Sequence, residues 1–256
     1  MCCSVCGLIR AQVDPDKKEL ANIYQKGYFF GDEYHDYIQD KKGLELNFSK
    51  RIKNLKPYLK KDITCIELGC CYGFFLNLLR PHVKKVVGYD ITKEGIEYTK
   101  KEFLIEAYCD SFLNYKGIPV DLIVMWDVIE HLDKPADYLT TIHKNLKKGG
   151  HLALTTGDIG SMMARIQGKK WRLIHPPTHL FYFNKESITK LLTVKGFKVL
   201  SIKYYPIFRN FGSVGYQFEK IYHIPLVNKI IQRTFLKKIN FGVNLYDIME
   251  VIAEKI

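Results

Sequence analysis

Several features that would assign this 256-residue chain to a specialised class are missing from it. No apolar run approaches the roughly 18 residues that a membrane-spanning helix needs, and no signal-peptide pattern is visible, so we expect a cytoplasmic protein without a transmembrane segment. Internal repeats and low-complexity tracts are also lacking, which argues against a solenoid or a disordered chain. The 47% hydrophobic and 13% aromatic residues indicate a folded core instead.

Clustered charge is lacking as well, although the formal net charge is +12. The lysines are spread along the whole chain, in runs no longer than pairs such as Lys60-Lys61. A surface that binds a polyanion concentrates its Lys and Arg residues. We therefore expect basic solvated faces and a small-molecule substrate, and we do not expect a nucleic-acid partner.

A complete set of zinc ligands is absent from the N-terminus. Cys3 and Cys6 form one C-x-x-C pair, which is similar to half of a zinc ribbon, whereas a structural zinc site needs four ligands. Four further cysteines fall in or beside predicted strands, where reduced cysteine packs as a small hydrophobe. We predict no zinc site here.

From residue 63 onward, short apolar runs alternate with helical stretches. Predicted strands cover 63–68, 85–89, 105–109, 121–126, 151–155, 197–205 and 246–254, and predicted helices cover 74–80, 92–102, 134–147 and 185–194. Strands that alternate with helices form parallel sheets with both faces covered. The fold class is therefore α/β, a Rossmann-like, mainly parallel seven-stranded sheet with helices on both faces.

Two further segments frame this pattern. Amphipathic helices are predicted at 15–27 and about 44–60, and a helical insertion of about 206–241 precedes the last strand. We expect an N-terminal helical lid over 1–43 and one Rossmann-like domain over 44–256. The insertion carries apolar residues at helical spacing with Lys and Arg between them, so internal packing, a pocket cap, a dimer face or peripheral membrane contact all remain open.

The most informative motif is a glycine loop between a strand and a helix, Glu67-Leu68-Gly69-Cys70-Cys71-Tyr72-Gly73. Glycines let the backbone approach a ligand closely, and the following helix offers unpaired N–H groups. A dinucleotide fingerprint that begins at Gly69 would need glycine at 71 and glycine or alanine at 74, where the chain has Cys71 and Phe74. The loop therefore disfavours NAD.

Acidic residues follow the next predicted strands. Asp90, Asp110 and Asp127 each end one strand, and Glu67 opens the glycine loop. In an open parallel sheet, ligands bind outside the carboxyl ends of the strands, where a carboxylate can accept the hydroxyls of a ribose. These four acids are predicted to share one crevice.

With these motifs, residues 44–205 and the final strand resemble the class I S-adenosylmethionine-dependent methyltransferases. The resemblance implies S-adenosylmethionine as cofactor and S-adenosylhomocysteine as product. It implies that the loop holds the methionine part, that Asp90 holds the ribose, and that Asp110 meets the adenine. The implied cofactor contacts are Glu67, Gly69, Cys71, Gly73, Asp90, Ile91, Asp110, Ser111, Phe112 and Asp127. Cys71 departs from the usual glycine, so a degenerate, non-catalytic binding protein stays an alternative.

The segment after the fourth predicted strand carries Asp127, Glu130 and His131 at i, i+3 and i+4. A similar E-x-x-E-H arrangement binds a divalent metal in quinone-biosynthesis O-methyltransferases, but helix capping and structural pairing explain the spacing as well. We predict that no metal is bound.

A stretch after the fifth predicted strand, Trp171 to Phe183, is similar to the acceptor region of the small-molecule branch of this family. It holds Trp171, His175 and His179, with Pro176-Pro177 stiffening the loop. His179 is the first candidate for a base that deprotonates the acceptor, and His131 is the second. An equally open interpretation is that His179 merely anchors the loop. Trp171, His175, Tyr34 and Tyr37 are the candidate acceptor-binding residues.

The acceptor class is predicted less directly. We favour methyl transfer to oxygen or nitrogen of a small polar metabolite, such as a sugar or natural-product intermediate. RNA methylation is the alternative enzymatic reading, and it would predict clustered Lys and Arg residues, which the sequence lacks. The protein is expected to be a monomer or a homodimer.

Overall fold

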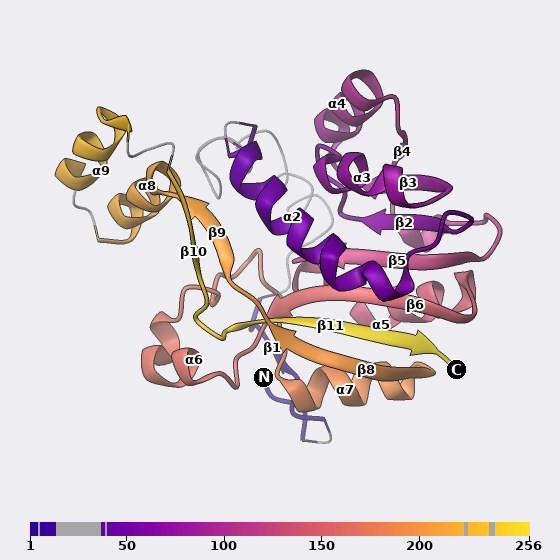
Figure 1. Ribbon diagram of the computed structural model, residues 1–256. Coiled ribbons are helices and arrows are strands. Elements are labelled where there is room, and N and C mark those ends of the chain that lie inside the picture. The colour runs from indigo at the N-terminus through magenta and orange to yellow at the C-terminus, as the bar shows by residue number, and fades with distance from the viewer. Residues whose placement is uncertain (5, 14–36, 39, 223–224, 236–238) are drawn as a thin grey trace.

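The computed structural model describes residues 1–4, 6–13, 37–38, 40–222, 225–235 and 239–256. Within them, seven strands form one sheet in the order β4-β3-β2-β5-β6-β11-β8 (Figure 1). The strands are β2 (Thr64–Leu68), β3 (Lys85–Asp90), β4 (Glu106–Cys109), β5 (Val120–Trp126), β6 (Leu146–Gly157), β8 (Phe197–Tyr204) and β11 (Ile248–Lys255). The predicted Rossmann-like sheet is confirmed.

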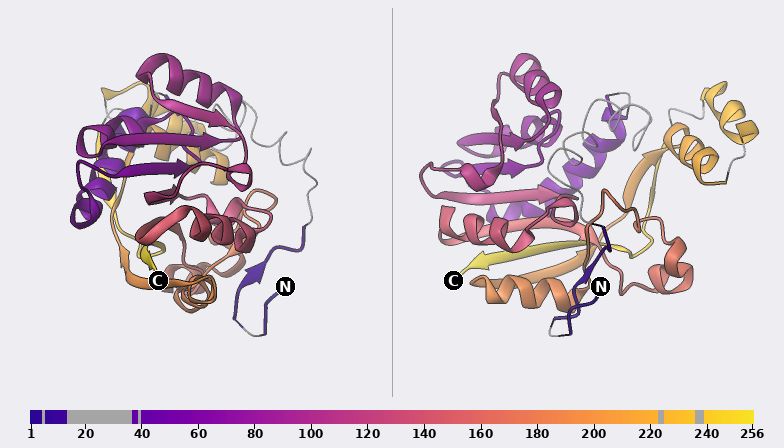
Figure 2. Two further views of the ribbon diagram at one scale, coloured as in Figure 1. Left: turned by 90° about the vertical axis from the view of Figure 1, so that its right-hand side faces the viewer. Right: turned by 180° about the vertical axis from the view of Figure 1, so that it is seen from behind.

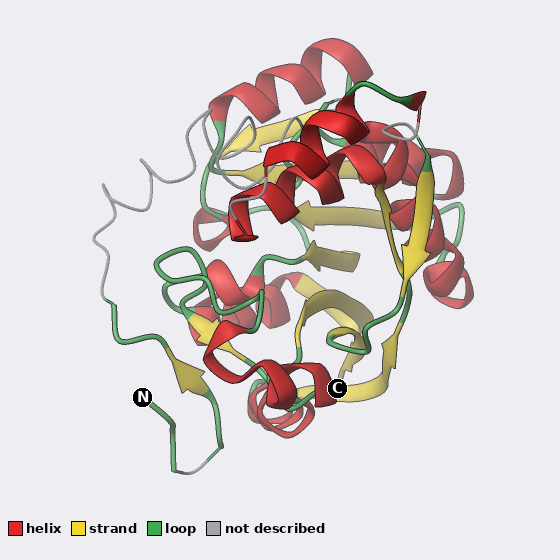
Figure 3. Cartoon of the chain, turned by 90° about the vertical axis from the view of Figure 1, so that its left-hand side faces the viewer, coloured by secondary structure: helices red, strands yellow, loops and turns green. Residues whose placement is uncertain are grey.

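Most neighbouring strands in this sheet run parallel. β4, β3, β2, β5 and β6 pair in parallel along the sheet, and β11 lies antiparallel between β6 and β8. The carboxyl ends of the five parallel strands therefore meet at one edge. Figure 3 views the molecule from the side of this edge.

Helices cover both faces of the sheet (Figure 2). α2 (Lys41–Leu55), α3 (Phe74–Leu79) and α4 (Lys93–Phe103) contribute to one apolar cluster, in which Leu55, Leu76 and Leu79 are fully buried. α5 (Pro135–Asn145) and α7 (Lys185–Val194) contribute to the other, through Leu139 and Leu192 among others. Burial of each such side chain stabilises the fold by about 1.5–3 kcal/mol, so the two cores hold the helices against the two faces of the sheet.

Some element boundaries differ from the prediction. The helix predicted at 134–147 ends at Asn145, because Leu146 already begins β6 and pairs with Val120. α2 starts at Lys41 and stops at Leu55, and a 3-10 turn with Pro57 follows it. A proline lacks the N–H that a continuing helix would need. The predicted helix at 15–27 and residue Tyr34 lie outside the described residues.

Short elements that periodicity did not reveal complete the fold. β1 (Ile9–Arg10) pairs antiparallel with β7 (Phe181–Tyr182), and α6 (Met162–Gln167) lies in the loop after β6. The insertion consists of β9 (Ile207–Asn210), α8 (Phe211–Tyr222), α9 (Pro225–Gln232) and β10 (Asn240–Val243), with β9 and β10 paired antiparallel. Its two helices project away from the sheet (Figures 1 and 2). The insertion is thus a β-hairpin that carries a helical pair.

A search of the described residues for a helix that is both long and apolar enough to cross a membrane finds none.

Candidate active site

A cavity of about 410 Å³ lies where the parallel strands end. This volume falls within the range of about 300–1,000 Å³ that is typical of small-molecule sites. Its walls come from the strand ends, from α2, from the loop after β6 and from β9. They include the predicted residues Tyr37, Glu67, Gly69, Cys71, Asp90, Ile91, Asp110, Ser111, Phe112, Asp127, His131, His175 and His179.

The glycine loop is shaped by left-handed backbone at three positions, Gly69, Cys71 and Gly73. Gly69 has φ of 70°, and a Cβ there would clash with Cγ2 of Val128. Cys71 has φ of 50°, which glycine adopts more easily than cysteine does. Its N–H donates to Oδ2 of Asp90 at 2.8 Å. Cysteine therefore takes the backbone conformation expected of the usual glycine, and a carboxylate at the end of β3 holds it there.

Gly73 serves packing and does not line the cavity. It precedes α3 with φ of 71°, and a Cβ would come within 2.7 Å of both Cγ2 and Oγ1 of Thr99. Thr99 belongs to α4. This predicted cofactor contact instead lets α3 and α4 approach each other.

A buried acid, Glu67, and a half-buried acid, Asp90, stand beside the loop. The side chain of Glu67 is almost fully buried, and its Oε2 has no hydrogen-bond partner. Burial raises the pKa of Glu67 well above its usual value. Asp90 accepts hydrogen bonds at Oδ1 from the N–H and the hydroxyl of Thr92, at 2.8 and 2.7 Å. Burial raises the pKa of Asp90 as well, against these hydrogen bonds. The pair forms an acidic wall that suits a cationic or hydroxyl-rich ligand.

The residues after β4 form a more open rim. Asp110 accepts hydrogen bonds at Oδ1 from the N–H of Ser111 and from Nδ2 of Asn114, at 2.7 and 2.8 Å. Phe112 is 2% exposed, whereas Ile91 is 55% exposed. A flat, partly apolar rim with one carboxylate can hold a heteroaromatic ring.

Asp127 lies at the end of β5 and is tied to α2. Its Oδ2 accepts from Nη2 of Arg51 at 3.0 Å, and its Oδ1 accepts from Oγ1 of Thr155 at 2.8 Å. Burial opposes ionisation, but the ion pair and these hydrogen bonds hold the pKa of Asp127 below its usual value. Asp127 is therefore an anion that is already partnered within the protein.

Arg51 is a cavity residue that the sequence prediction missed. It is 8% exposed, and its guanidinium lies 4.8 Å from the ring centre of Trp126 and 5.5 Å from that of Phe48. The sequence did contain one signal for this residue, because Arg51 lies between Phe48 and Ile52 on the apolar side of the 44–60 helix, where a charged side chain is unexpected. Only a long-range contact could show that its partner is Asp127.

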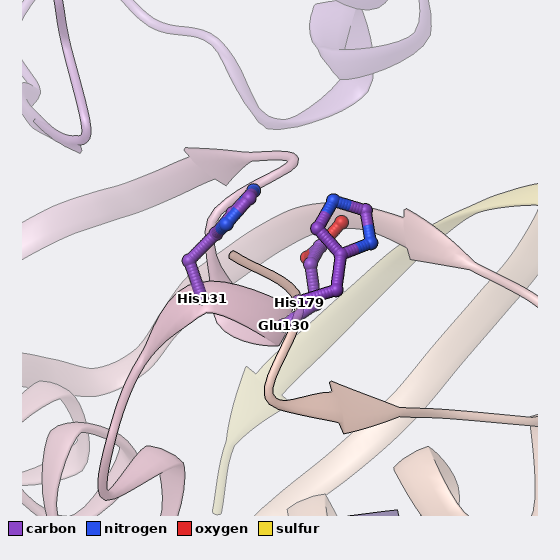
Figure 4. A group of neighbouring side chains, drawn as sticks. All are labelled: Glu130, His131 and His179. Carbon is purple, nitrogen blue, oxygen red and sulfur yellow. The ribbon is translucent and has the colours of Figure 1, made fainter. Parts of the chain in front are cut away.

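Two histidines face each other at the other end of the cavity (Figure 4). Nδ1 of His131 lies 2.9 Å from the carbonyl oxygen of Thr178, and Nδ1 of His179 lies 2.8 Å from that of Leu173. A carbonyl oxygen only accepts, so each Nδ1 carries the proton and each neutral ring has its lone pair on Nε2. Burial lowers the pKa of His131 to about 4, and burial together with His131 lowers that of His179 to about 3.

Glu130 joins these histidines. It is 5% exposed, its Oε2 has no hydrogen-bond partner, and burial together with the charge of Asp127 raises its pKa to about 8. One potential ligand atom from each of Glu130, His131 and His179 lies within 4.8 Å of the others, a spacing that could hold a metal ion. The sequence pattern had grouped Asp127, Glu130 and His131 as possible metal ligands. In the structure His179 replaces Asp127 in this group. A carboxyl group with a pKa of about 8 is mostly protonated near neutral pH, which opposes metal binding.

The loop after β6 divides its predicted residues between the cavity and the protein interior. His175 lines the cavity, and its Nδ1 lies 2.7 Å from Oγ1 of Thr178. Trp171 is 2% exposed, does not line the cavity, and donates through Nε1 to Oδ2 of Asp247 at 3.0 Å. Arg172 donates to the same carboxylate. Trp171 therefore anchors the loop to the segment before β11 and is no wall of the cavity.

The base of the insertion is the second feature that the sequence prediction missed. Phe208 of β9 lines the cavity, and Asn47 of α2 holds both of its backbone groups, donating to its carbonyl at 2.9 Å and accepting from its N–H at 2.7 Å. Nδ2 of Asn210 donates to Oδ1 of Asp40 at 2.6 Å. The hairpin is thus fixed to α2 beside the cavity.

Comparisons with known proteins bear on this arrangement. Residues 41–202 match the model of a family described as a methyltransferase domain. The chain belongs to this methyltransferase family. The predicted methyltransferase domain is confirmed, and S-adenosylmethionine is the cofactor of this family.

Individual relatives are more distant. A protein of Mycolicibacterium smegmatis named "probable S-adenosylmethionine-dependent methyltransferase" is 25% identical over 137 residues, which are 52% of this chain and 51% of that protein. The match thus spans about half the length of this curated relative.

Solved structures share the fold. Magnesium protoporphyrin IX methyltransferase from Synechocystis, crystallised with bound S-adenosylhomocysteine, has a TM-score of 0.61 at 14% identity over 94% of this chain and 100% of its own. An S-adenosylmethionine-dependent methyltransferase from Archaeoglobus fulgidus has a TM-score of 0.59 at 20% identity, over 90% and 100%.

The cavity of this methyltransferase fits the family's cofactor. The unpartnered Oε2 of buried Glu67 can accept a hydrogen bond from an ammonium group, and Gly69 lines the cavity beside it. Arg51 is a cation close to this wall, and Asp127 neutralises it.

Proposed function

We propose that this methyltransferase transfers a methyl group to oxygen or nitrogen of a small polar metabolite, such as a sugar or natural-product intermediate. The observation that carries the proposal is one cavity in which strand-end carboxylates stand at one end and two neutral histidines at the other. S-adenosylmethionine supplies a methyl group that is already activated by its sulfonium. The protein's own residues have to bind the cofactor and the acceptor, align them with each other and exclude water.

At the cofactor end, Glu67, Asp90 and Asp110 would hold the ammonium, the ribose hydroxyls and the adenine, respectively. Asp90 uses one lone pair of Oδ2 for Cys71 and retains others for a hydroxyl. Phe112 and Ile91 would cover the ring beside Asp110. Asp127 would act through Arg51 and Thr155 as part of the scaffold.

At the acceptor end, Nε2 of His179 would take the proton that a hydroxyl or ammonium acceptor must lose. Its Nδ1 bond to Leu173 fixes the tautomer and the direction of the ring. His131 would be the alternative proton acceptor, and His175 would contact the acceptor from the rim. Residues 1–43 would act as a lid, because Tyr37 stacks on Tyr72 and Phe74 at the cavity, with ring centres 5.6 and 5.7 Å away.

The test combines cofactor binding with product detection. Calorimetry should show that S-adenosylhomocysteine binds the wild type and that Asp90→Ala loses this binding. Incubation with a methyl-labelled cofactor and a panel of sugars, phenols and amines should then give a mass-shifted product. Cofactor binding without any methylated product would favour the degenerate, non-catalytic reading.

A further inference from the structure

The insertion contains a long stretch without acidic residues. Residues 220–246 include no Asp or Glu, although the chain holds 27 such residues in 256. The same stretch carries five cations, Lys220, Lys229, Arg233, Lys237 and Lys238. The net charge of this stretch is therefore positive, although no long run of lysines marks it in the sequence.

α9 and the turn that follows it combine this charge with exposed apolar side chains. Leu226, Ile230 and Phe235 are 64%, 55% and 77% exposed, and Lys229 and Arg233 are exposed beside them. We call these five residues the docking face. α9 lies at the outer end of the projecting insertion in both views (Figures 1 and 2). Nothing in the described part of the chain covers these side chains.

The chemistry of the docking face narrows what can cover it. A nucleic acid would neutralise the cations but would leave the aliphatic side chains in water. A second copy in a two-fold interface would bring Lys229 and Arg233 against the same cations of its partner. A bilayer with anionic lipids offers both hydrocarbon at the interface and negative headgroups. We infer that the docking face binds an anionic lipid surface.

The insertion that carries this surface is attached beside the cavity. β9 runs directly into α8, and Asn47 holds the backbone of Phe208 in β9 at the cavity wall. A bound membrane would therefore lie on the side of the molecule toward which the insertion projects. The inference goes beyond the proposed function, because lipid binding requires neither cofactor nor methyl acceptor.

Sedimentation with vesicles tests the inference directly. The full chain should co-sediment with vesicles of phosphatidylcholine and phosphatidylglycerol in equal parts, and much less with phosphatidylcholine alone. Binding should weaken in high salt, because the headgroup charges are screened. The charge reversal Lys229→Glu with Arg233→Glu should lower the partition coefficient by at least about 30-fold, from the usual contribution of each cation near an anionic surface. Ile230→Asp should also weaken binding.

Lys100→Glu with Lys101→Glu is the matched control, since it changes the net charge equally on exposed residues of α4. This control should retain most of the binding, and S-adenosylhomocysteine should bind all variants equally, which shows that they are folded. The inference is overturned if the wild type ignores anionic vesicles, or if the α4 control loses as much binding as the α9 variant. It is also overturned if sedimentation equilibrium shows a dimer that only the α9 variants dissociate, because the face would then bind a second copy.

Discussion

In the glycine-loop half of the cavity, several functional groups are bonded to near neighbours in the sequence. Asp90 accepts from Thr92, two residues away, and Asp110 accepts from Ser111, the next residue. In the opposite half longer-range partners take part, since His131 meets Thr178 across 47 positions and Asn47 meets Phe208 across 161. The difference teaches that local turns shape much of the cofactor end, whereas the acceptor end depends on contacts between segments that are far apart in the chain.

The largest expected effect concerns the acceptor half. His179→Ala should lower kcat by about 10²–10⁴, the usual contribution of general acid–base catalysis, with an unchanged affinity for S-adenosylhomocysteine. Since the pKa of His179 is about 3, the wild-type kcat should show no acidic limb near pH 6.5. Steady-state kinetics on a verified hydroxyl or amine acceptor measure both.

His179→Asn is the control for this prediction. Its amide nitrogen takes the place of Nδ1, so it can still donate to the carbonyl of Leu173 and position the loop, but it cannot serve as a base. If His179→Asn keeps kcat while His179→Ala does not, the role of His179 is positioning, and the base has to be sought at His131 or His175.

The next effect concerns the glycine-loop half. Gly69→Ala should weaken S-adenosylhomocysteine binding by about 100-fold, because it adds left-handed strain and a clash with Val128. Adding Val128→Ala should recover part of the affinity by removing the clash. Gly149→Ala carries the same strain at φ of 72°, but its Cβ would meet only Oε1 of Glu254, at an ordinary 3.7 Å. Calorimetry should therefore find that this variant binds S-adenosylhomocysteine with unchanged affinity. A failure of Val128→Ala to help would show that the backbone conformation alone matters.

The same contrast between local and long-range contacts explains which residues of the cavity could be predicted from the sequence. Glu67, Asp90 and Asp110 could be found because a strand, a glycine loop and a helix are local patterns with readable spacing. Arg51 looked like any polar residue on an apolar helix face, since nothing near it in the sequence marks Asp127 as its partner. Trp171 looked like a pocket wall for the same reason: its hydrogen bond to Asp247 spans 76 positions. The β9–β10 pairing was hidden because its strands are short and lie on either side of a helical insertion.

The remote pairing should contribute to stability in a measurable way. Arg51→Met leaves Asp127 without its cation, so the free energy of unfolding should fall by about 1–2 kcal/mol, less than for a fully buried pair because Asp127 is partly exposed. Adding Asp127→Asn should recover part of this loss. Lys41→Met removes the exposed pair with Glu45 on the same helix, and it should cost less than about 0.5 kcal/mol. Urea unfolding separates these cases, and equal losses for both single variants would contradict the prediction.

Acid should weaken the acceptor half selectively. The folded-state pKa values of His131 and His179, about 4 and about 3, lie below the value near 6.5 of an unfolded chain. Their contribution to stability is therefore fully present above about pH 6.5 and is lost as the pH falls through about 4. Glu130, with a raised pKa of about 8, has the opposite dependence, losing its contribution as the pH rises through that value.

The comparison of wild type with the His131→Gln, His179→Gln double variant isolates the histidines. Urea unfolding at about pH 7 and at about pH 4 gives the free energy of unfolding at each pH. The decrease in this free energy on acidification should be smaller in the variant than in the wild type. If the free energy of unfolding depends on pH in the same way in both proteins, the pKa values of the two histidines do not change on folding.

The smallest expected effect is that of metal removal. Chelation should leave turnover unchanged, because the sulfonium is activated without a metal and Glu130 is mostly protonated near neutral pH. Turnover with and without a chelator, followed by added Mg²⁺ or Zn²⁺, measures this. If the chelator stops turnover and an added ion restores it, Glu130, His131 and His179 form a metal centre.

The chain has two tryptophans, and the fold places one in each half. Trp126 lies beneath the guanidinium of Arg51 at the cavity, and Trp171 is buried against Asp247 behind the acceptor loop. Their intrinsic fluorescence can therefore report on the two halves separately. In a Trp171→Phe protein the emission of Trp126 should follow cofactor titration, and in a Trp126→Phe protein the emission of Trp171 should follow movement of the loop. One optical experiment on unlabelled protein can thus establish which half responds first when cofactor and acceptor are added.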